Sequence, residues 1–494
     1  MIFKSFVTYA NKRGTGIVRI PKDKRDLFKE GELLRITVLS QDKISFYARV
    51  RKINNLGFYI PKEIMRKIEF PKEHTLQFEK IDGFCSKIGS DGRVYIPAGT
   101  AEKFNLKNDN ITLIEGIVEN QKFSLFCQVK ARIKRKETEY KVTFNKNLAD
   151  KSGIFDVKRN LSKEKQELSL NADLLKIIAP FNYAFIDKDE IILFYGNRVP
   201  VIINTKLKID DFAYYLGAYF ADGTKRGNSW GIVASTFEQA NFYIEKHKNL
   251  IKNAFLVNEL SFSSFDTKDP DKIKDNLSKI WLDKTRVLIT KNKIRMRFII
   301  DSAYSKRNEF GSLIMKENKQ LVLLFYVRML NFLIEKIVRE KNKTLAVHFI
   351  LGCLEGDGNP GPAPHPHIIL TTNKNDYKTL ERIASVSGLR FASILEAKSS
   401  KHYLRFSSLS ILMNLDVLKD LIFKYYPKRR KRFIERFLNT GSARFLMGKQ
   451  DYASGWVKAE LVKEGILDES YALTKKGKNI RKSLMELAES VTVK

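Results

Sequence analysis

The chain has little of what marks secreted or membrane proteins. Only 3 of its 494 residues are cysteines, Cys85, Cys127 and Cys353, which lie far apart and follow no metal-binding spacing. We therefore expect no disulfide framework, no zinc cluster and a reduced, cytoplasmic compartment. The most apolar run, Leu321–Val327, is too short to span a bilayer and is followed by charged residues, so it predicts a buried helix. The first residues contain no long apolar stretch, and we expect no signal peptide and no membrane partner.

Acidic residues are scarce relative to basic ones. Lys and Arg number 89 against 56 Asp and Glu, which gives a formal net charge of +33. A surplus of this size predicts a polyanionic partner. Because the basic residues are spread over the whole chain, they favour extended contact with nucleic acid over a membrane-anchoring patch; the alternative is a merely soluble basic protein. The length predicts three or four domains of roughly 150 residues each.

Two short segments repeat one pattern, an apolar helical run that ends in Asp-Gly. They are Tyr215–Gly223 (YLGAYFADG) and Ile350–Gly358 (ILGCLEGDG). Each carries small residues four positions apart, which allow two helices to approach closely. We expect each helix to stop at its final glycine in a left-handed cap.

The caps would place Asp222 and Asp357 at helix C-termini, the unfavourable end of the helix dipole for a carboxylate. If the helices pack together, the two acids also repel each other. That arrangement favours a divalent cation between them. The alternative is two ordinary amphipathic helices that happen to end in Asp-Gly.

This pair of segments resembles the motif of the LAGLIDADG homing-endonuclease family in its single-chain, two-repeat form. The third-position glycine, the catalytic aspartate and the final glycine match in both copies, whose aspartates lie 135 residues apart. At the sixth position, where the family prefers an acid, the second copy has Glu355 but the first has Phe220.

The resemblance implies Mg²⁺-dependent, site-specific cleavage of double-stranded DNA. Asp222 and Asp357 would hold the metal, helped by the backbone carbonyls of Ala221 and Gly356. A basic side chain usually assists in this family, and the candidates, which no motif fixes, are Lys293 and Lys398.

The residues after each Asp-Gly predict a strand, a helix and further strands. The resemblance implies that they form a pseudo-twofold saddle with the order helix–strand–strand–helix–strand–strand (αββαββ). In the first half we expect strand 231–235, a helix over about 238–254 and strands 286–290 and 294–300; in the second, strand 368–372, a helix over about 376–386 and strands 391–397 and 403–407. Arg295 and Arg297 alternate with apolar residues and would present cations to a DNA groove. Lys225 and Arg226, in the polar loop after the first motif, are further candidate DNA contacts.

The first third of the chain contains an internal repeat. Gly16–Pro21 (GIVRIP) recurs as Gly92–Pro97 (GRVYIP) and more loosely as Gly57–Pro61 (GFYIP). Each copy follows an alternating strand and precedes a short helix, with proline as its N1 residue, and a second strand. This pattern resembles the AbrB-type swapped-hairpin DNA-binding family, in which two units interlock. Three copies leave one unpaired, and Phe123–Leu148 is a candidate degenerate fourth.

The resemblance implies that particular basic residues of the repeats contact DNA. Arg93 matches the residue after the family's glycine, while Arg25 and Arg66 match basic positions in its short helix. Arg13 flanks a hairpin without a clear match. The alternative is a β-rich scaffold with solvated charges.

The C-terminal residues resemble a winged helix-turn-helix. A helix over about 455–464, a Gly-Ile-Leu turn, a short hairpin, Leu-Thr-x-x-Gly and a final helix follow in order. The resemblance makes the first of these the recognition helix, with Trp456 and Lys458. The basic run Pro427–Arg432 predicts the DNA-facing end of an amphipathic helix. The alternative is a structural helical cap.

These patterns predict an α+β chain with residues 1–150 as AbrB-like repeats, 151–205 as a bridging segment, 206–438 as the nuclease core (halves about 206–343 and 344–438) and 439–494 as a winged helix. The favoured function is a monomeric DNA endonuclease, nucleoid-associated in the cytoplasm. The alternative is a domesticated, non-cleaving transcriptional regulator on the same scaffold. The sequence specifies neither the target site nor the cut geometry, and it does not separate DNA cleavage from RNA-maturase activity.

Overall fold

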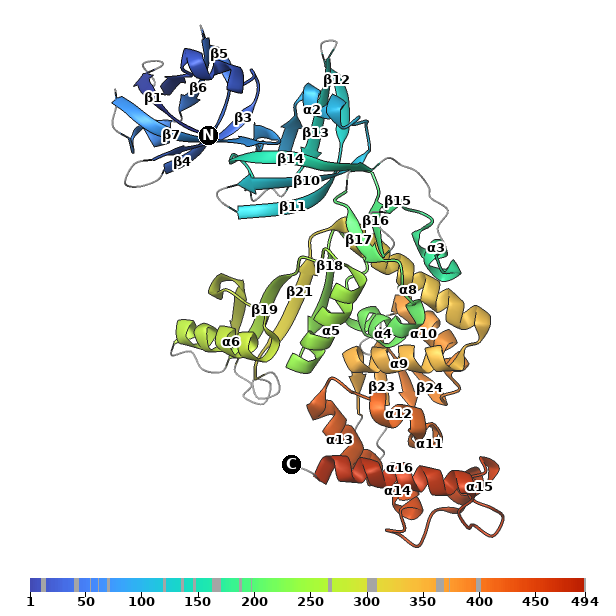
Figure 1. Cartoon of the computed structure of the whole chain (residues 1–494). Helices are drawn as coiled ribbons and strands as arrows, with labels where there is room; N and C mark the ends of the chain where they lie inside the picture. Colours follow the sequence, from blue (N-terminus) through green and yellow to red (C-terminus); the bar gives the residue numbers. More distant parts are fainter. Residues whose placement is uncertain are drawn as a thin grey trace. The chain divides into compact units, whose positions relative to one another are not determined.

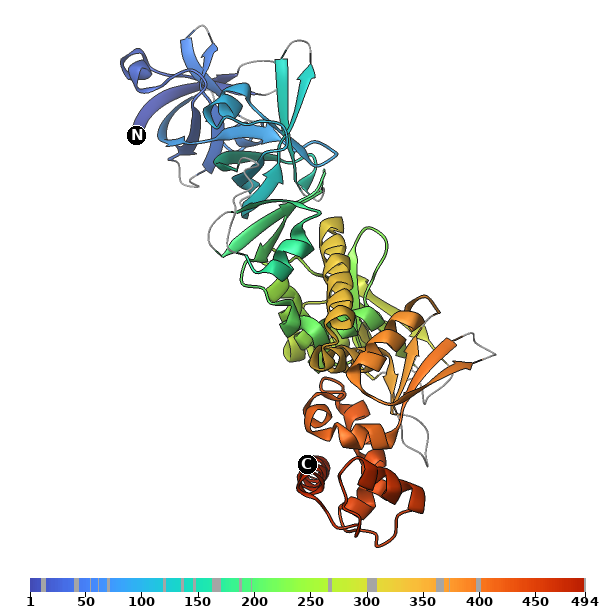
Figure 2. The same ribbon diagram turned by 90° about the vertical axis from the view of Figure 1, so that its right-hand side faces the viewer.

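The structure is a computed structural model of the whole chain, shown in two views in Figures 1 and 2. It describes all residues except 10–14, 40–43, 54, 61, 69–71, 119–120, 135–136, 145–147, 162–169, 186–188, 197, 265–268, 300–308, 361–367, 373, 397–400 and 493–494. The chain divides into two compact units, Met1–Lys165 and Gln166–Lys494. Both helices and strands are abundant, so the α+β class is confirmed at that level. In the described residues, no helix is long and apolar enough to cross a membrane.

The first unit begins with a sheet built from the first two repeat copies. The first copy comprises β1 (Ile2–Tyr9), β2 (Gly16–Arg19), η1 (Lys22–Leu27) and β3 (Leu33–Val38). The second comprises β4 (Ile44–Arg49), β5 (Arg51–Ile53), β6 (Asn55–Ile60), α1 (Lys62–Met65) and β7 (Lys72–Ile81). The seven strands follow the order β4-β3-β7-β1-β2-β6-β5 around a core of alternating apolar side chains.

Most strand pairs in this sheet join one copy to the other. β7 lies between β3 and β1, β2 pairs with β6, and β3 pairs with β4. Neither copy could close its own core, because each supplies the neighbours of the other's strands. The two copies therefore form one interlocked barrel.

The third copy and the segment after it pair in the same way. The third copy comprises β8 (Phe84–Lys87), β9 (Arg93–Ile96), α2 (Ala98–Lys103) and β10 (Ile111–Val118). The partner segment comprises β11 (Gln121–Gln128), β12 (Lys130–Lys134), β13 (Glu137–Thr143) and β14 (Ser152–Leu161). β14 lies between β10 and β8, and β9 pairs with β13. The segment from β11 to β14 thus takes the place of the candidate fourth copy and extends beyond residue 148.

The second unit opens with α3 (Ala172–Ile178) and the sheet β15 (Asn182–Phe185), β16 (Glu190–Phe194) and β17 (Val201–Asn204). The elements that follow are η3 (Ile209–Phe212), α4 (Ala213–Asp222), β18 (Trp230–Ala234), α5 (Phe237–Leu250), β19 (Val257–Ser264), α6 (Pro270–Thr285), η4 (Lys291–Lys293), β20 (Ile294–Phe298), β21 (Ser312–Glu317) and α8 (Gln320–Glu340). Their sheet has the order β18-β21-β19-β20. The run Leu321–Val327 lies in α8. As predicted it is buried, except for Leu324 and Val327, which are partly buried.

The second half follows the expected helix–strand–strand–helix–strand–strand order, whereas in the first half a single strand precedes α5, and α6 separates β19 from β20. The second half contains α9 (Lys343–Asp357), β22 (Gly358–Asn359), β23 (Ile368–Thr372), α10 (Lys374–Ser387), β24 (Phe391–Glu396) and β25 (Lys401–Phe406), with sheet order β22-β23-β25-β24. The chain ends in α11 (Ser408–Met413), α12 (Leu415–Leu421), α13 (Pro427–Leu438), α14 (Gly441–Leu446), α15 (Gly455–Lys463) and α16 (Lys475–Thr492), the orange-to-red helices at one end of this unit in Figure 2. One continuous apolar core runs from Leu174 to Leu487. The domain boundary proposed after residue 438 stays a sequence prediction.

Three expectations about local structure were wrong. Residues 286–290 form no strand, because Arg286 ends α6 in the left-handed conformation (φ 58°). Gly223 and Gly358 do not cap their helices in the left-handed region but are extended, at φ −89° and −69°, since the chain runs directly into strand pairing. The prolines Pro21 and Pro97 occupy the N-cap position, one residue before N1.

Candidate functional site

The two motif segments form the helices α4 and α9, which pack against each other, as Figure 1 shows. Their contact is nearly backbone to backbone. A Cβ atom at Gly217 would collide with the Phe349 carbonyl, and one at Gly352 with the Tyr214 carbonyl. The prediction that small residues bring these helices together is confirmed, because only glycine fits at both positions.

The close packing brings the two Asp-Gly ends together. A Cβ atom at Gly356 would lie 2.7 Å from Asp222 Oδ2 and 2.8 Å from Ala221 Cβ, so the carboxylate of one helix rests on the end of the other. Asp357 is exposed, whereas Asp222 is partly buried. Two carboxylates from different halves of the chain therefore share one small region.

Their proximity has an electrostatic effect. Burial and then the negative charge of Asp357 raise the pKa of Asp222 to about 7, while the positive charge of Arg429 opposes the shift. Burial and a neighbouring negative charge both disfavour the ionised form of Asp222, and a bound cation would stabilise that form. The donor set, two carboxylates and the backbone carbonyls of Ala221 and Gly356, is of the hard oxygen type that Mg²⁺ takes. In the described part of the chain, no cluster of three or more His, Cys, Asp or Glu side chains forms an alternative metal site.

Arg429, from α13, lies beside the aspartate pair and was missed by sequence reasoning. Its Nη1 donates to the carbonyl oxygen of Gly356 at 2.6 Å, and its guanidinium lies 4.2 Å from the centre of the Tyr426 ring. The carbonyl expected to help hold a metal thus already accepts a charged hydrogen bond. The basic run Pro427–Arg432 is the available signal, but the sequence alone predicts that it faces DNA.

The segment just before α13 holds Arg429 in place. Tyr425 N donates to Glu355 Oε2 at 3.2 Å, and Tyr425 O accepts from Thr236 Oγ1 at 2.7 Å. The Tyr425 ring also stacks on Phe242, with ring centres 4.0 Å apart. These three contacts, all made by Tyr425, fix the segment that leads into α13 and thereby the position of the Arg429 guanidinium.

Glu355, the acid at the sixth motif position, points into the protein instead of toward the aspartates. It is fully buried and accepts hydrogen bonds from Tyr214 Oη at 2.7 Å and from Gln239 Nε2 at 3.0 Å, as well as from Tyr425 N. Its contacts join α4, α5, α9 and the segment just before α13. Phe220, at the corresponding position of α4, packs on Phe349 instead, with ring centres 5.6 Å apart. The missing acid at Phe220 therefore removes a structural clamp and leaves the aspartate pair intact.

The other predicted site residues of this unit lie apart from the pair. Lys225 forms an ion pair with Asp376 at 2.6 Å and covers the Phe220 ring at 4.0 Å. Arg295, on the edge strand β20, pairs with Glu259 at 2.9 Å, and the charge of Lys293 also acts on that glutamate. Arg226 and Arg297 are exposed. Lys398 lies outside the described residues.

The basic candidates of the N-terminal unit and of α15 are placed as follows. Arg25 Nε donates to the Ile20 carbonyl at 3.2 Å, Arg66 is exposed just after α1, and Arg93 pairs with Asp91 at 3.3 Å. Arg13 lies outside the described residues. Lys458 Nζ lies 5.0–5.9 Å from the ring centres of Tyr471, Phe445 and Tyr452.

Comparisons with known proteins found no matching family model and no matching curated protein. Among solved structures, this chain is similar to three of the homing endonuclease I-DmoI: bound to DNA and Mn, as mesophilic variants, and bound to DNA and Ca. The identities are 14%, 13% and 14%, and the TM-scores are 0.21, 0.22 and 0.19. The matches cover 44%, 43% and 47% of this chain and 98%, 96% and 91% of the other chains. Similarity at this level carries no argument about function, which must come from the site itself.

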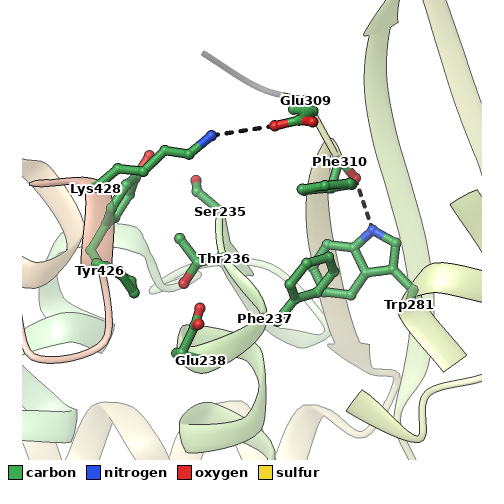
Figure 3. A pocket seen from close by; sticks show the side chains of 10 residues that line it. Ser235, Thr236, Phe237, Glu238, Trp281, Glu309, Phe310, Tyr426 and Lys428 are labelled. Carbon is green, nitrogen blue, oxygen red and sulfur yellow. Dashed lines mark hydrogen bonds and ion pairs between the residues drawn. The ribbon is translucent and has the colours of Figure 1, made fainter. Parts of the chain in front are cut away.

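A pocket of about 200 Å³ lies between the start of α5 and the start of α13 (Figure 3). Phe237 and Phe310 line one wall and Tyr426 the other, while Lys428 reaches across to Glu309 at 3.4 Å. This ion pair is exposed and therefore adds little to the stability of the fold. The pocket borders the segment that positions Arg429, so packing here supports the site.

Gly352→Ala is expected to destabilise the protein strongly, because the added methyl group meets backbone atoms of Tyr214 and Ala218 that cannot move independently. Overpacking of this kind costs about 1–3 kcal/mol or more. Gly441→Ala is the matched control, since nothing lies within 4 Å of its added Cβ. Urea unfolding of both variants measures the difference. Equal loss of stability in the two would contradict the close contact of α4 and α9.

The raised pKa of Asp222 predicts how metal-free stability depends on pH. Between about pH 4 and pH 7 the folded protein keeps a proton on Asp222 that the unfolded chain has released. The folded state binds more protons there, so this group makes the free energy of unfolding fall as pH rises. Asp222→Asn should therefore gain stability relative to the parent protein at pH 8 but not at pH 4. Urea midpoints measured in EDTA test this, and a difference independent of pH would contradict it.

Proposed function

We propose that the chain is a divalent-metal-dependent DNA endonuclease of the LAGLIDADG type, with Asp222 and Asp357 as its catalytic acids. The single observation that carries the proposal is the convergence of two Asp-Gly helix ends through a glycine-only contact. A pair of carboxylates beside a phosphate backbone repels it, so a protein that only binds DNA gains nothing from keeping both. The net charge of +33 supports a nucleic acid as the partner.

In this proposal Asp222, Asp357 and the Ala221 carbonyl hold Mg²⁺, which lowers the pKa of a bound water and stabilises the leaving oxygen when it is present. Asp222 must lose its proton to serve as a ligand, so metal binding weakens below about pH 7. Arg429 keeps the site near neutral charge before metal and DNA arrive. Lys293 and Lys398 remain candidate assistants without further support.

The flanking parts of the chain belong to the proposal as DNA-binding modules. The interlocked repeats would act as AbrB-type units through Arg25, Arg66 and Arg93, and α15 would act as the recognition helix of a winged helix. α15 also pairs with the second half, because Arg390 forms ion pairs with Glu460 at 2.5 Å and Glu464 at 2.6 Å. This double ion pair supports a C-terminal module that docks on the nuclease core. We also propose a monomeric, nucleoid-associated protein.

The alternative, a non-cleaving regulator, is favoured by one observation. Arg429 supplies a fixed cation at the Gly356 carbonyl, so the carboxylate pair has a partial counter-charge without any metal. A scaffold that had lost cleavage would need such a charge to approach DNA. The two functions therefore differ in whether a metal ion binds at the carboxylate pair beside this guanidinium.

The decisive experiment incubates the full chain with a plasmid library of random sites and Mg²⁺ at several temperatures. We expect linear products whose ends define one long site, and none from the double variant Asp222→Asn, Asp357→Asn. Parallel incubations with Mn²⁺ or Ca²⁺ in place of Mg²⁺, in which both cleavage and DNA binding are measured, separate metal-dependent cleavage from metal-dependent binding. An intact library under all conditions, with DNA bound tightly in EDTA, would favour the regulator.

A further inference from the structure

A groove of about 450 Å³ lies in the first unit, outside the site described above. One wall comes from β4, β5 and β6 of the second repeat copy and the other from β8 and β9 of the third. Five of its lining residues carry the argument: Arg49, Arg51, Tyr59, Cys85 and Tyr95. None of them has a role in the proposed cleavage chemistry.

The groove is positively charged. Arg49 and Arg51 line it, no acidic residue is among its lining residues, and neither arginine has an acidic partner in the part of the chain that the structure describes. Lys141 adds a cation whose Nζ lies 4.5 Å from the centre of the Tyr95 ring, although Glu139 pairs with it at 3.3 Å. Arginines without carboxylates favour an anionic ligand.

The groove also exposes aromatic rings. Tyr59 and Tyr95 occupy the same position in their repeat copies, the residue before Ile-Pro, and are 38% and 48% exposed. The corresponding residue of the first copy is Arg19. Exposed rings beside cations are the combination that binds nucleic acid through stacked bases and neutralised phosphates.

We propose that this groove binds an unpaired nucleic-acid strand, with phosphates at Arg49 and Arg51 and bases on Tyr59 and Tyr95. Bases in a duplex are already stacked on their neighbours, so a tyrosine ring can stack only on an unpaired base. A surface made for duplex backbone would need the arginines alone. The ligand goes beyond the proposed function, which concerns duplex DNA, and it does not depend on cleavage.

Cys85 makes the proposal testable in the intact protein. Its thiol lies in the groove and is exposed, whereas Cys127 and Cys353 are buried, so a maleimide reagent labels Cys85 selectively in the folded chain. An oligonucleotide of about ten unpaired residues, within the usual site size for one strand, should slow this labelling at least about fivefold. DNA and RNA strands form separate arms that show which sugar is preferred.

Three competitors can overturn the proposal. A duplex of the same sequence that protects Cys85 equally well would make the groove a duplex contact. A mononucleotide that protects fully would make it a small-molecule site, and a poly-glutamate peptide that protects fully would make it a general anion site. Failure of every probe to protect Cys85 also rejects it, whatever the outcome of the cleavage assay.

Variants locate the contacts. Tyr59→Ala and Tyr95→Ala should each weaken strand binding about tenfold, while Tyr59→Phe should restore nearly full affinity because it keeps the ring. Arg51→Gln should weaken binding and reduce its salt dependence, with Arg35→Gln as control, since Arg35 lies on β3 and pairs with Glu79 at 3.6 Å. Equal effects of the two arginine variants would contradict binding in the groove, and the Phe variant keeps the test valid if an Ala variant misfolds.

Discussion

Asp357→Asn is expected to abolish DNA cleavage while preserving DNA affinity, and Asp222→Asn should do the same. Loss of residues that merely orient a metal ligand already costs about 10–100-fold, so loss of a ligand itself should exceed a hundredfold. Binding should be unchanged or tighter, because each variant removes a negative charge near the phosphates. Single-turnover cleavage and binding titrations in Ca²⁺ measure the two effects separately.

Asp211→Asn provides the matched control for these variants. Asp211 is exposed in η3, directly ahead of the helix that ends in Asp222. It should cleave at the parental rate. If Asp222→Asn or Asp357→Asn also cleaved at that rate, the aspartates would be structural helix ends and the nuclease proposal would lose its central observation.

The second large effect concerns Arg429→Met. Because the Arg429 guanidinium donates to the Gly356 carbonyl, its removal should lower metal-free stability by about 1–3 kcal/mol, the usual cost of losing a hydrogen bond to a charged group. Under the nuclease proposal the same change frees a metal ligand and removes a competing cation. Ca²⁺ affinity at pH 8.5 should then rise by about tenfold, which corresponds to about 1.4 kcal/mol.

Arg432→Met controls for the loss of one charge on the same helix, since Arg432 is exposed. Calorimetric titration with Ca²⁺ and thermal unfolding in EDTA give the two readouts. A variant that binds no Ca²⁺, like its parent, and loses DNA affinity in EDTA would support the regulator. Unchanged stability and unchanged Ca²⁺ affinity would mean that the contact with Gly356 is incidental.

The parts of the site that sequence predicts are those encoded within single elements. The motif helices, their glycine contact and the placement of Asp222 and Asp357 follow from residues within nine-residue segments. The repeat strands follow from alternation and from the Ile-Pro signal. The AbrB-type and winged-helix interpretations and the roles of the individual basic residues stay predictions.

Arg429 and Glu355 show where sequence reasoning stops. The bond from Arg429 to Gly356 joins residues 73 positions apart, and no local pattern distinguishes it from the other cations of its run. Glu355 matches the motif, but its side chain points into the protein because it accepts hydrogen bonds from Tyr214, Gln239 and Tyr425. These three residues come from three other segments of the chain. The strands β19 and β21 were missed for a similar reason: they gain their identity from pairing with each other and with β18.

The interlocked barrels also constrain how the chain is made. β7 separates β1 from β3, so each of these two strands lacks one sheet neighbour until Lys72–Ile81 has left the ribosome. The third copy and its partner segment repeat this delay, because β14 separates β8 from β10. Both copies of each barrel lie on one polypeptide, so refolding should be first-order and independent of protein concentration. Refolding should nevertheless be slow for domains of this size, because the strand pairs are distant in sequence. Until β7 and β14 are made, the strands that will pair with them are exposed sheet edges on which nascent chains can aggregate.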